Sequence, residues 1–213
     1  MKNKILIQCD FDGTVTYKDV SFLLLDAFAG YEWRDYLDQY QDGKISVGEF
    51  SRKSFSMVKA SRQEMLDYIK TKVRIRQGFK QFMEFCKGKN FRLVIVSNGL
   101  DFYIDDILKN LGLKDVEYHA AETIFNHEGL RVSYASPEGK TIDADFKLSY
   151  MEKFLDEGYE VVYIGDGNSD FVPAQKCHHI FATDSLLRRC KYHDLACIPF
   201  SDFFDVIKVM ETW

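Results

Sequence analysis

The chain has 213 residues, 46% of them hydrophobic and 15% aromatic, and its formal net charge is −5. This length fits one domain, or one domain with an insertion, with enough apolar side chains for a sizeable core. The 28 lysines and arginines are scattered and no apolar stretch approaches ~18 residues, so we expect neither a nucleic-acid partner nor a membrane partner. Five cysteines without short paired spacing argue against a disulfide framework and a zinc site, and reduced thiols fit a cytoplasmic protein.

Apolar runs that alternate with helical patterns predict the fold class. The predicted strands cover residues 4–9, 91–96, 116–121, 160–164, 179–183 and 195–199. The predicted helices between them include residues 77–88, 101–111, 146–157, 170–176 and 184–193. This alternation favours an α/β fold with a Rossmann-like, doubly wound parallel sheet.

Residues 17–75 interrupt the alternation with helical spacing of apolar residues and almost no strand signal. We interpret them as a four-helix insertion, a cap domain on a core formed by residues 1–16 and 76–213. Ser61 and Glu64 have the spacing of a capping box, which predicts the start of its last helix. An insertion at the functional edge of a sheet is well placed to cover an active site.

A second exception lies in the middle of the chain. Residues 123–125 and 130–134 flank the sequence Asn126-His127-Glu128-Gly129. Two short apolar runs around polar residues and a glycine predict a small β-hairpin with a four-residue loop.

Acidic residues follow two of the predicted strands. Asp10 and Asp12 come directly after Ile5-Leu6-Ile7, and Asp166 follows the run 161–164. Alternating side chains would put Asp10 and Asp12 on one face if the strand continued, and two such close acids repel each other unless a cation is bound. Because ligands bind at the carboxyl ends of parallel strands, the sequence predicts one hard-cation site built from Asp10, Asp12 and Asp166.

Two further groups occur between these acids. Ser97-Asn98-Gly99 follows the apolar run 93–96, and Lys147 lies near the start of the predicted helix 146–157. Taken singly, they read as a turn and as a surface lysine. Together with Asp10, Asp12, Asp166 and Asp170, in this order and spacing, they resemble the four motifs of the haloacid dehalogenase superfamily of aspartate-dependent phosphatases. The insertion resembles the helical C1-type cap of that family, and the chain is most similar to its phosphoserine phosphatases and methionine-salvage enolphosphate phosphatases.

The resemblance implies a phosphatase that uses Mg²⁺ and hydrolyses a small phosphomonoester through an aspartyl-phosphate. The resemblance makes Asp10 the nucleophile. A carboxylate that attacks phosphorus divides one difficult displacement into two easier ones. Asp12 would protonate the leaving oxygen and then deprotonate the attacking water.

The other motif residues have matching roles. Ser97 would offer its hydroxyl, and Asn98 and Gly99 their backbone N–H groups, to the phosphoryl oxygens. Lys147 would supply positive charge to the same oxygens and to Asp10.

The remaining acids would support the metal and its neighbours. Asp166 would complete the oxygen ligands of Mg²⁺. Asp170 would hold either a metal-bound water or Lys147, and Thr14 would orient Asp12 through its hydroxyl.

Three residues of the insertion are candidates for contacts with the substrate. Asp19 lies where related phosphatases carry an acid that enters the pocket, although its position equally fits a helix N-terminal charge. Arg52 and Lys53 are candidate partners for a substrate carboxylate. The substrate itself, beyond a small phosphorylated metabolite, and the oligomeric state do not follow from the sequence.

Other functions fit part of the pattern. One is a phosphotransferase that uses a small alcohol in place of water. Others are a receiver-like signalling module and a non-catalytic protein that binds phosphate. The long insertion and the second acidic cluster disfavour a receiver, and the complete set of charged residues disfavours a non-catalytic protein.

Overall fold

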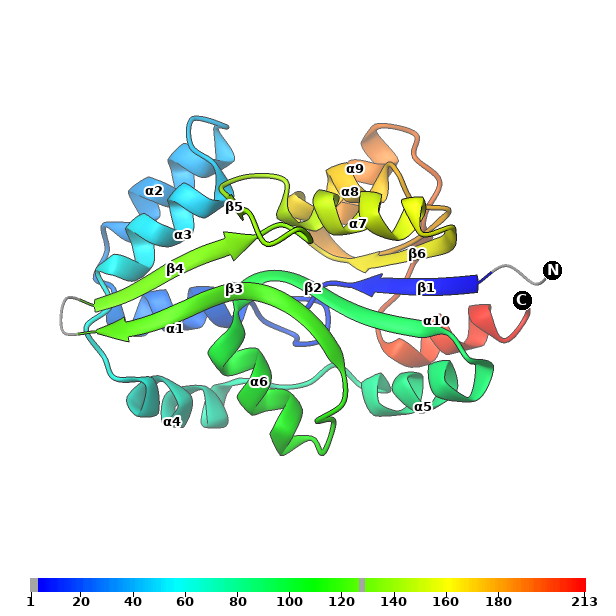
Figure 1. Ribbon diagram of the computed structural model, residues 1–213, viewed down its shortest axis with the longest axis horizontal. Coiled ribbons are helices and arrows are strands. Elements are labelled where there is room, and N and C mark those ends of the chain that lie inside the picture. The colour runs from blue at the N-terminus through cyan, green and yellow to red at the C-terminus, as the bar shows by residue number, and fades with distance from the viewer. Residues whose placement is uncertain (1–3, 127–128) are drawn as a thin grey trace.

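The computed structural model describes residues 4–126 and 129–213, and its centre is an eight-stranded sheet (Figure 1). The strands are β1 (Lys4–Cys9), β2 (Arg92–Leu100), β3 (Glu117–Asn126), β4 (Gly129–Ala135), β5 (Thr141–Ile142), β6 (Tyr159–Gly165), β7 (His179–Ala182) and β8 (Ile198–Pro199). Their order is β5-β4-β3-β2-β1-β6-β7-β8. The six strands from β3 to β8 in this order are parallel, whereas β4 and β5 pair antiparallel.

Helices cover both faces of the sheet. They are α5 (Phe79–Lys89), α6 (Asp101–Asn110), α7 (Phe146–Asp156), α8 (Phe171–Ala174), α9 (Asp184–Tyr192) and α10 (Phe203–Met210). Figure 1 shows α7, α8 and α9 on one face and α5, α6 and α10 on the other. The predicted doubly wound α/β fold is therefore confirmed.

The central strands are apolar because both of their faces are covered. Leu6 and Ile7 of β1 and Val161 to Ile164 of β6 have no exposed surface. Strands buried on both faces read as continuous apolar runs instead of alternating patterns, and this is why the sequence identified them. The two strands pair in register from Lys4 and Tyr159 to Cys9 and Ile164, which brings their carboxyl ends to the same edge.

Some elements differ from the predictions. β2 continues past residue 96 to Leu100, with a change of register against β3 between Val96 and Leu100. Asn126 and Gly129, expected in the hairpin loop, instead pair with each other as the last residues of β3 and β4, so the four-residue loop was wrong. Residues 127 and 128 of that loop lie outside the described residues. The short β5 and the C-terminal α10 were not predicted.

Four helices lie between β1 and α5. They are α1 (Val20–Phe28), α2 (Trp33–Gln41), α3 (Val47–Ser56) and α4 (Arg62–Lys72). Asp19, Ser46 and Ser61 accept backbone N–H groups at the starts of α1, α3 and α4, and Ser61 with Glu64 forms the predicted capping box. Such caps satisfy N–H groups that would otherwise lack a partner in the first helical turn.

The chain enters and leaves this helical segment at neighbouring positions. Thr16 and Ile75 form an antiparallel bridge, and the N–H of Arg76 donates to the carbonyl of Val15 at 2.8 Å. Arg76 is buried, and its guanidinium also donates to the carbonyls of Thr14 (2.8 Å) and Ser201 (2.7 Å). The turn after β1 is therefore fixed to the rest of the core at the point where the helical segment begins.

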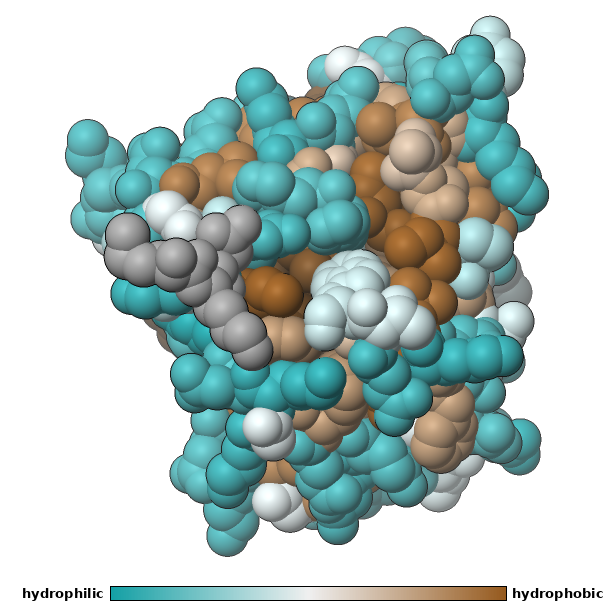
Figure 2. All heavy atoms as spheres, turned by 90° about the vertical axis from the view of Figure 1, so that its right-hand side faces the viewer, coloured by the Kyte–Doolittle hydropathy of each residue, from teal (hydrophilic) through white to brown (hydrophobic). Residues whose placement is uncertain are grey.

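The amino-terminal edge of the sheet has a different character. Figure 2 shows this end of the molecule, where hydrophilic residues surround a hollow with exposed hydrophobic surface. The hollow is lined by residues that include Ile5, Phe91, Tyr159 and Trp213. Within the described part of the chain, no helix has the length and apolar character needed to cross a membrane.

Candidate active site

A cavity of about 280 Å³ lies at the carboxyl-terminal edge of the sheet, between the sheet and the helical segment. Most of the residues that the sequence proposed for the site line this cavity; Thr14, Arg52, Lys53 and Asp170 do not. The carboxyl ends of β1, β2 and β6 bring the first, second and fourth motifs there, and the first turn of α7 brings Lys147. Distant segments of the chain thus meet in one polar site.

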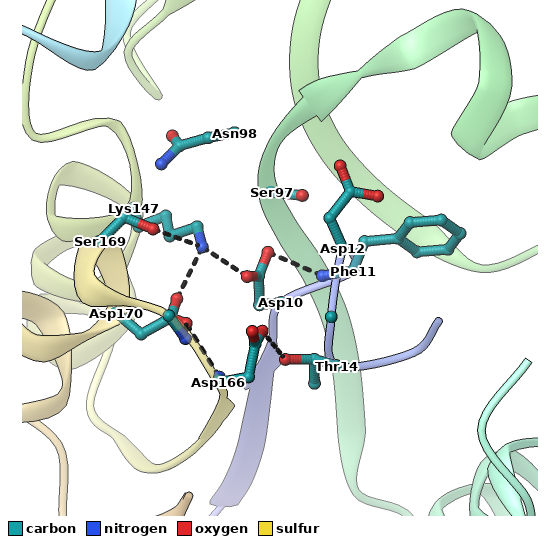
Figure 3. Close-up of polar contacts among 12 residues, drawn as sticks. Asp10, Phe11, Asp12, Thr14, Ser97, Asn98, Lys147, Asp166, Ser169 and Asp170 are labelled. Atoms are coloured by element: carbon teal, nitrogen blue, oxygen red, sulfur yellow. Dashed lines mark hydrogen bonds and ion pairs between the residues drawn. The ribbon is translucent and has the colours of Figure 1, made fainter. Parts of the chain in front are cut away.

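Asp10 and Lys147 form the floor of the cavity. Lys147 Nζ lies 2.7 Å from Asp10 Oδ2, and the N–H of Phe11 donates to Asp10 Oδ1 at 2.7 Å (Figure 3). Both side chains are buried, and Gln8 accompanies them by donating to the carbonyl of Lys147 at 2.8 Å. The carboxylate of Asp10 is therefore held in one orientation at the base of the cavity.

Asp170 is the second partner of Lys147. Its Oδ1 lies 2.6 Å from Lys147 Nζ and accepts the hydroxyl of Tyr163 at 2.7 Å. Its Oδ2 accepts the N–H groups of Asp166 and Gly167. Of the two roles proposed for Asp170, the structure supports the contact with Lys147, and the same carboxylate shapes the turn that carries Asp166.

Asp166 lies beside Asp10. Carboxylate oxygens of Asp10, Asp166 and Asp170 lie within 4.8 Å of one another. Thr14 donates its hydroxyl to Asp166 Oδ1 at 2.7 Å, so the expectation that Thr14 orients Asp12 was wrong. Gly13 packs directly on the same carboxylate: its φ is +77°, and a Cβ there would lie 2.3 Å from Asp166 Oδ2. Only glycine fits this close approach.

The side chain of Asp12 lies outside this acidic cluster. β1 ends at Cys9, so the alternation of a strand does not continue to Asp12, and Figure 3 shows its carboxylate directed away from Asp166 and Lys147. Tyr103 of α6 donates its hydroxyl to Asp12 Oδ2, while Oδ1 is buried without a partner among the described residues. The prediction that the Asp12 carboxylate is a metal ligand is therefore not supported, whereas its place in the cavity suits proton transfer.

The Ser97-Asn98-Gly99 segment occupies the irregular part of β2. The N–H of Gly99 donates to Ser97 Oγ at 3.1 Å, and the side-chain oxygen of Asn98 is buried without a described partner. A Cβ at Gly99 would lie 2.2 Å from the hydroxyl of Tyr103 and 2.8 Å from Asp12 Oδ2. The missing side chain lets this segment approach Asp12 closely. Ser97, Asn98 and Gly99 thus line the same cavity as Asp10 and contribute hydroxyl, amide and N–H groups to it.

Asp10, Asp12 and Asp166 have pKa values above their ordinary range. Burial raises the pKa of Asp10 to about 6 even though Lys147 opposes the shift. Burial, followed by the charges of Asp170 and Asp10, raises the pKa of Asp166. Burial and the charge of Asp19 raise the pKa of Asp12, which favours a protonated side chain there.

These shifts and the ligand chemistry fit a hard cation between Asp10 and Asp166. The carboxylates are close, buried and acidic, with oxygen as the only ligand atom, which suits Mg²⁺ and not zinc. Each oxygen of Asp170 accepts two protein donors, whereas each oxygen of Asp10 accepts one and the carboxylate of Asp166 accepts one, from Thr14, among the described residues. Asp10 and Asp166 therefore keep more free acceptor capacity and are the better ligands.

Arg52 is placed away from the cavity. Its guanidinium pairs with both carboxylate oxygens of Asp143 on the surface, and Lys53 pairs with Glu49. The predicted contact of either cation with a substrate carboxylate therefore lacks support in the structure. The reason is the direction of α3, which turns these positions toward solvent and turns Phe50 and Phe55 inward.

Asp19 lies both at a helix N-terminus and in the wall of the cavity, the two positions that the sequence left open. Its carboxylate accepts the N–H of Phe22 at 2.8 Å and so caps α1, and it also lines the cavity. Burial raises its pKa to about 6. The rest of the cavity wall from the helical segment is mainly apolar and aromatic, including Phe22, Leu37, Tyr40, Phe50 and Phe55.

Sequence reasoning missed several polar residues in and around the site. They include Arg76, which holds the turn after β1, Tyr103, which contacts Asp12, and Tyr134, which donates to the carbonyl of Asn98 at 2.7 Å. Tyr103 lies shortly after the Ser-Asn-Gly segment, in the first turn of α6, and this spacing was a usable signal. Arg76 and Tyr134 reach the site only through tertiary packing and carry no motif.

A doubly wound sheet with a buried lysine and clustered aspartates at its carboxyl edge defines an α/β enzyme site. The model of the haloacid dehalogenase-like hydrolase family matches residues 7–172. The chain belongs to this family, as its four motifs predicted.

Individual proteins are similar over almost the whole chain. The 2-hydroxy-3-keto-5-methylthiopentenyl-1-phosphate phosphatase of Geobacillus thermodenitrificans strain NG80-2 is 35% identical, with 97% of this chain and 96% of the relative covered. The protein of the same name from Geobacillus kaustophilus strain HTA426 is 32% identical, with 99% and 97% covered. A solved structure of phosphoserine phosphatase as a phospho-aspartyl intermediate analogue has a TM-score of 0.73, 23% identity, and coverage of 98% and 99%. The last similarity concerns the fold.

Proposed function

We propose that the protein is a Mg²⁺-dependent phosphatase that hydrolyses a small phosphomonoester through an aspartyl-phosphate on Asp10. The observation that carries this proposal is the placement of the Asp10 carboxylate, held by Lys147 at 2.7 Å and adjacent to Asp166, at the base of a cavity. A buried, oriented carboxylate with a cation beside it can attack phosphorus without first being desolvated. A cytoplasmic location remains a prediction.

The reaction divides into two displacements. In the first, a carboxylate oxygen of Asp10 attacks phosphorus, the bond from phosphorus to the leaving oxygen breaks, and Asp12 donates its proton to that oxygen. In the second, Asp12 accepts a proton from a water that attacks phosphorus, and the bond from phosphorus to Asp10 breaks to release inorganic phosphate. The raised pKa of Asp12 suits this double role, because the acid retains a proton for the first step.

The surrounding groups stabilise the charge on the phosphoryl oxygens. Lys147 remains charged, because the attraction of Asp10 and Asp170 outweighs the burial that would otherwise lower its pKa. Ser97 and the backbone of Asn98 and Gly99 border the same space. Mg²⁺ held by Asp10 and Asp166 would add positive charge to offset the negative charge of the transferred group.

The cavity supports a substrate with a neutral, partly apolar leaving group. Among the described residues that line it, Lys147 is the only lysine or arginine, and its contacts are with Asp10 and Asp170. A substrate carboxylate, as in phosphoserine, would meet Asp19 and aromatic side chains without a compensating cation. We therefore propose 2-hydroxy-3-keto-5-methylthiopentenyl-1-phosphate, the compound in the names of the similar proteins, whose thioether suits contact with aromatic rings.

Residues 17–75 would act as the cap over this site. Their helices supply the apolar wall, and the bridge between Thr16 and Ile75 brings both connections to one place. A cap with this arrangement can close for the first displacement and open to admit water for the second.

Initial rates of phosphate release test the proposal. We expect the purified protein with Mg²⁺ to have a kcat/KM for the methylthiopentenyl phosphate at least about a hundredfold above that for O-phosphoserine, since a buried, uncompensated charge is strongly disfavoured. Asp10→Asn should abolish both activities, and Asp67→Asn on the exposed surface of α4 should change neither. A preference for phosphoserine would reject the proposed substrate, and full activity of Asp10→Asn would reject the proposed mechanism.

A further inference from the structure

Tyr134 of β4 connects the helical segment to the second motif. Its side chain is 2% exposed, and its hydroxyl lies 2.7 Å from the carbonyl oxygen of Asn98 and 2.9 Å from Oγ of Ser51. A carbonyl oxygen can only accept, so Tyr134 uses its single proton for Asn98. Ser51 must then donate to Tyr134. The two hydrogen bonds form a directed chain from α3 through β4 to the Ser-Asn-Gly segment.

The carbonyl of Asn98 belongs to the peptide group whose N–H is that of Gly99. A trans peptide is planar, and its C=O and N–H point in opposite directions. A hydroxyl that holds the carbonyl on one side therefore also fixes the direction of the Gly99 N–H on the other. That N–H points to Ser97 Oγ at 3.1 Å, beside the cavity, where the transferred phosphoryl group would bind.

The contact with Ser51 depends on the position of the helical segment. α3 lies along β4, as Figure 1 shows, and Ser51 is 4% exposed in this arrangement. A movement of α3 away from β4 would break the bond from Ser51 and return both hydroxyls to water. The orientation of the Tyr134 hydroxyl is thus complete only when the helical segment is closed.

We propose that Tyr134 is a positioning residue that couples closure of the cap, through Ser51, to the orientation of the phosphate-binding peptide between Asn98 and Gly99. The proposal rests on the phosphatase function proposed above. It assigns the coupling to a pair of hydroxyl groups outside the four motifs: Ser51 lines the wall of the cavity, and Tyr134 does not.

The same helix supplies a matched control. Ser54 is fully buried on α3, and its hydroxyl has no hydrogen-bond partner among the described residues. Ser54→Ala and Ser51→Ala remove the same atom from neighbouring turns, but only the second removes the contact with Tyr134. A general loss of packing in α3 would affect both variants. A direct contact of Ser51 with the substrate would be lost in the Tyr134→Phe background as well, whereas the proposed coupling is lost on Ser51→Ala only while the hydroxyl of Tyr134 is present.

A double-mutant cycle with Ser51→Ala and Tyr134→Phe tests the proposal. We would measure kcat and KM for the methylthiopentenyl phosphate and for p-nitrophenyl phosphate, and the affinity for inorganic phosphate with Mg²⁺ by calorimetry. We expect Tyr134→Phe to lower kcat and weaken phosphate binding by about 3–10-fold, the scale of one hydrogen bond, with KM nearly unchanged. Ser51→Ala should show a smaller decrease in kcat and in phosphate affinity than Tyr134→Phe. The double variant should have the same kcat and phosphate affinity as Tyr134→Phe, because Ser51 acts through Tyr134.

Several results would overturn the proposal. Losses that multiply in the double variant would make the two residues independent, and equal losses in Ser51→Ala and Ser54→Ala would reduce Ser51 to a packing role. If thermal unfolding shows that Tyr134→Phe does not fold, the comparison of Ser51→Ala with Ser54→Ala decides. If the wild-type protein hydrolyses no phosphomonoester, the proposed function fails, and unchanged affinity of Tyr134→Phe for inorganic phosphate would separately reject the coupling.

Discussion

The hydroxyl of Thr14 donates to Asp166 Oδ1 at 2.7 Å and joins the turn after β1 to the turn after β6. The bond orients Asp166, one proposed metal ligand. Its donor, Thr14, belongs to the loop that carries the other proposed ligand, Asp10. Removal of such a supporting contact typically weakens metal affinity by about 10–100-fold.

Thr14→Val should therefore raise the Mg²⁺ concentration needed for half-maximal activity by about 10–100-fold, with a smaller effect on kcat at saturating Mg²⁺. The substitution keeps the shape of the side chain and replaces the hydroxyl with a methyl group. Thr14→Ser should keep near wild-type affinity because it keeps that group. A Mg²⁺ titration of the three proteins provides the measurement, and identical midpoints for wild type and Thr14→Val would contradict the role of Asp166 as a ligand.

Lys147 should contribute to stability as well as to the reaction. It is buried between Asp10 and Asp170, so Lys147→Met leaves two buried carboxylates without their cation. Breaking a buried pair in this way costs about 3–5 kcal/mol of the free energy of unfolding. Urea denaturation without metal measures this loss. Lys153→Met, which breaks an exposed pair with Glu157, should change stability by less than about 0.5 kcal/mol; a similar loss in both variants would argue against the buried network.

The raised pKa values predict how pH and metal act together. Without metal, burial raises the pKa of Asp10 from 3.8 to about 6, and burial also raises that of Asp166. The folded protein then binds more protons than the unfolded chain between about pH 4 and pH 6, so the free energy of unfolding falls as pH rises through this interval.

Mg²⁺ should reverse this trend because it binds the deprotonated carboxylates. We expect the increase in unfolding temperature on addition of Mg²⁺ to be larger above about pH 7 than near pH 5, where protons compete for Asp10. Scanning fluorimetry at matched ionic strength measures both increases, and Asp166→Asn should reduce them. An increase that does not depend on pH would argue against binding at this cluster.

Asp19 has a structural role and a proposed substrate role that two substitutions can separate. Asp19→Ala removes both the cap of α1 and the negative charge in the cavity, whereas Asp19→Ser keeps a capping oxygen. We expect both variants to lose about 1–3 kcal/mol in kcat/KM for the true substrate, the scale of a hydrogen bond to a charged group, and much less for an aryl phosphate. Only Asp19→Ala should lower the unfolding temperature. Equal losses with both substrates would assign Asp19 to the fold or to the reaction itself.

The sequence predicted most of the fold because the central strands are buried on both faces. The runs Ile5 to Ile7 in β1 and Val161 to Ile164 in β6 are apolar without interruption, and the four motifs mark strand ends and a helix start. The prediction missed α10, whose eight residues follow the last strand closely. It also ended β2 too early, because polar residues at a change of register resemble a turn.

Spacing along the chain located the site but not the direction of each side chain. Asp12 was expected beside Asp10 on one face, but the strand ends before it and the turn rotates its carboxylate toward Tyr103. Arg52 faces solvent because of the rotation of α3, which is set by packing of its aromatic face. Contacts such as those of Tyr134 with Asn98 join residues that only the folded sheet brings together. The roles assigned to the site residues remain predictions.

The helical segment enters and leaves the core at neighbouring residues, Thr16 and Ile75. Sequence changes in this segment are therefore separated from changes in the residues that would hold the phosphoryl group. Since both connections leave the sheet at one point, helices of another length or packing can be joined there without moving the ends of β1, β2 and β6. Substitutions that reshape the wall around Phe22 and Phe50 leave the bonds among Asp10, Lys147 and Asp170 intact. A lineage of such proteins can therefore acquire new leaving-group preferences by drift within one segment while its phosphoryl chemistry stays fixed.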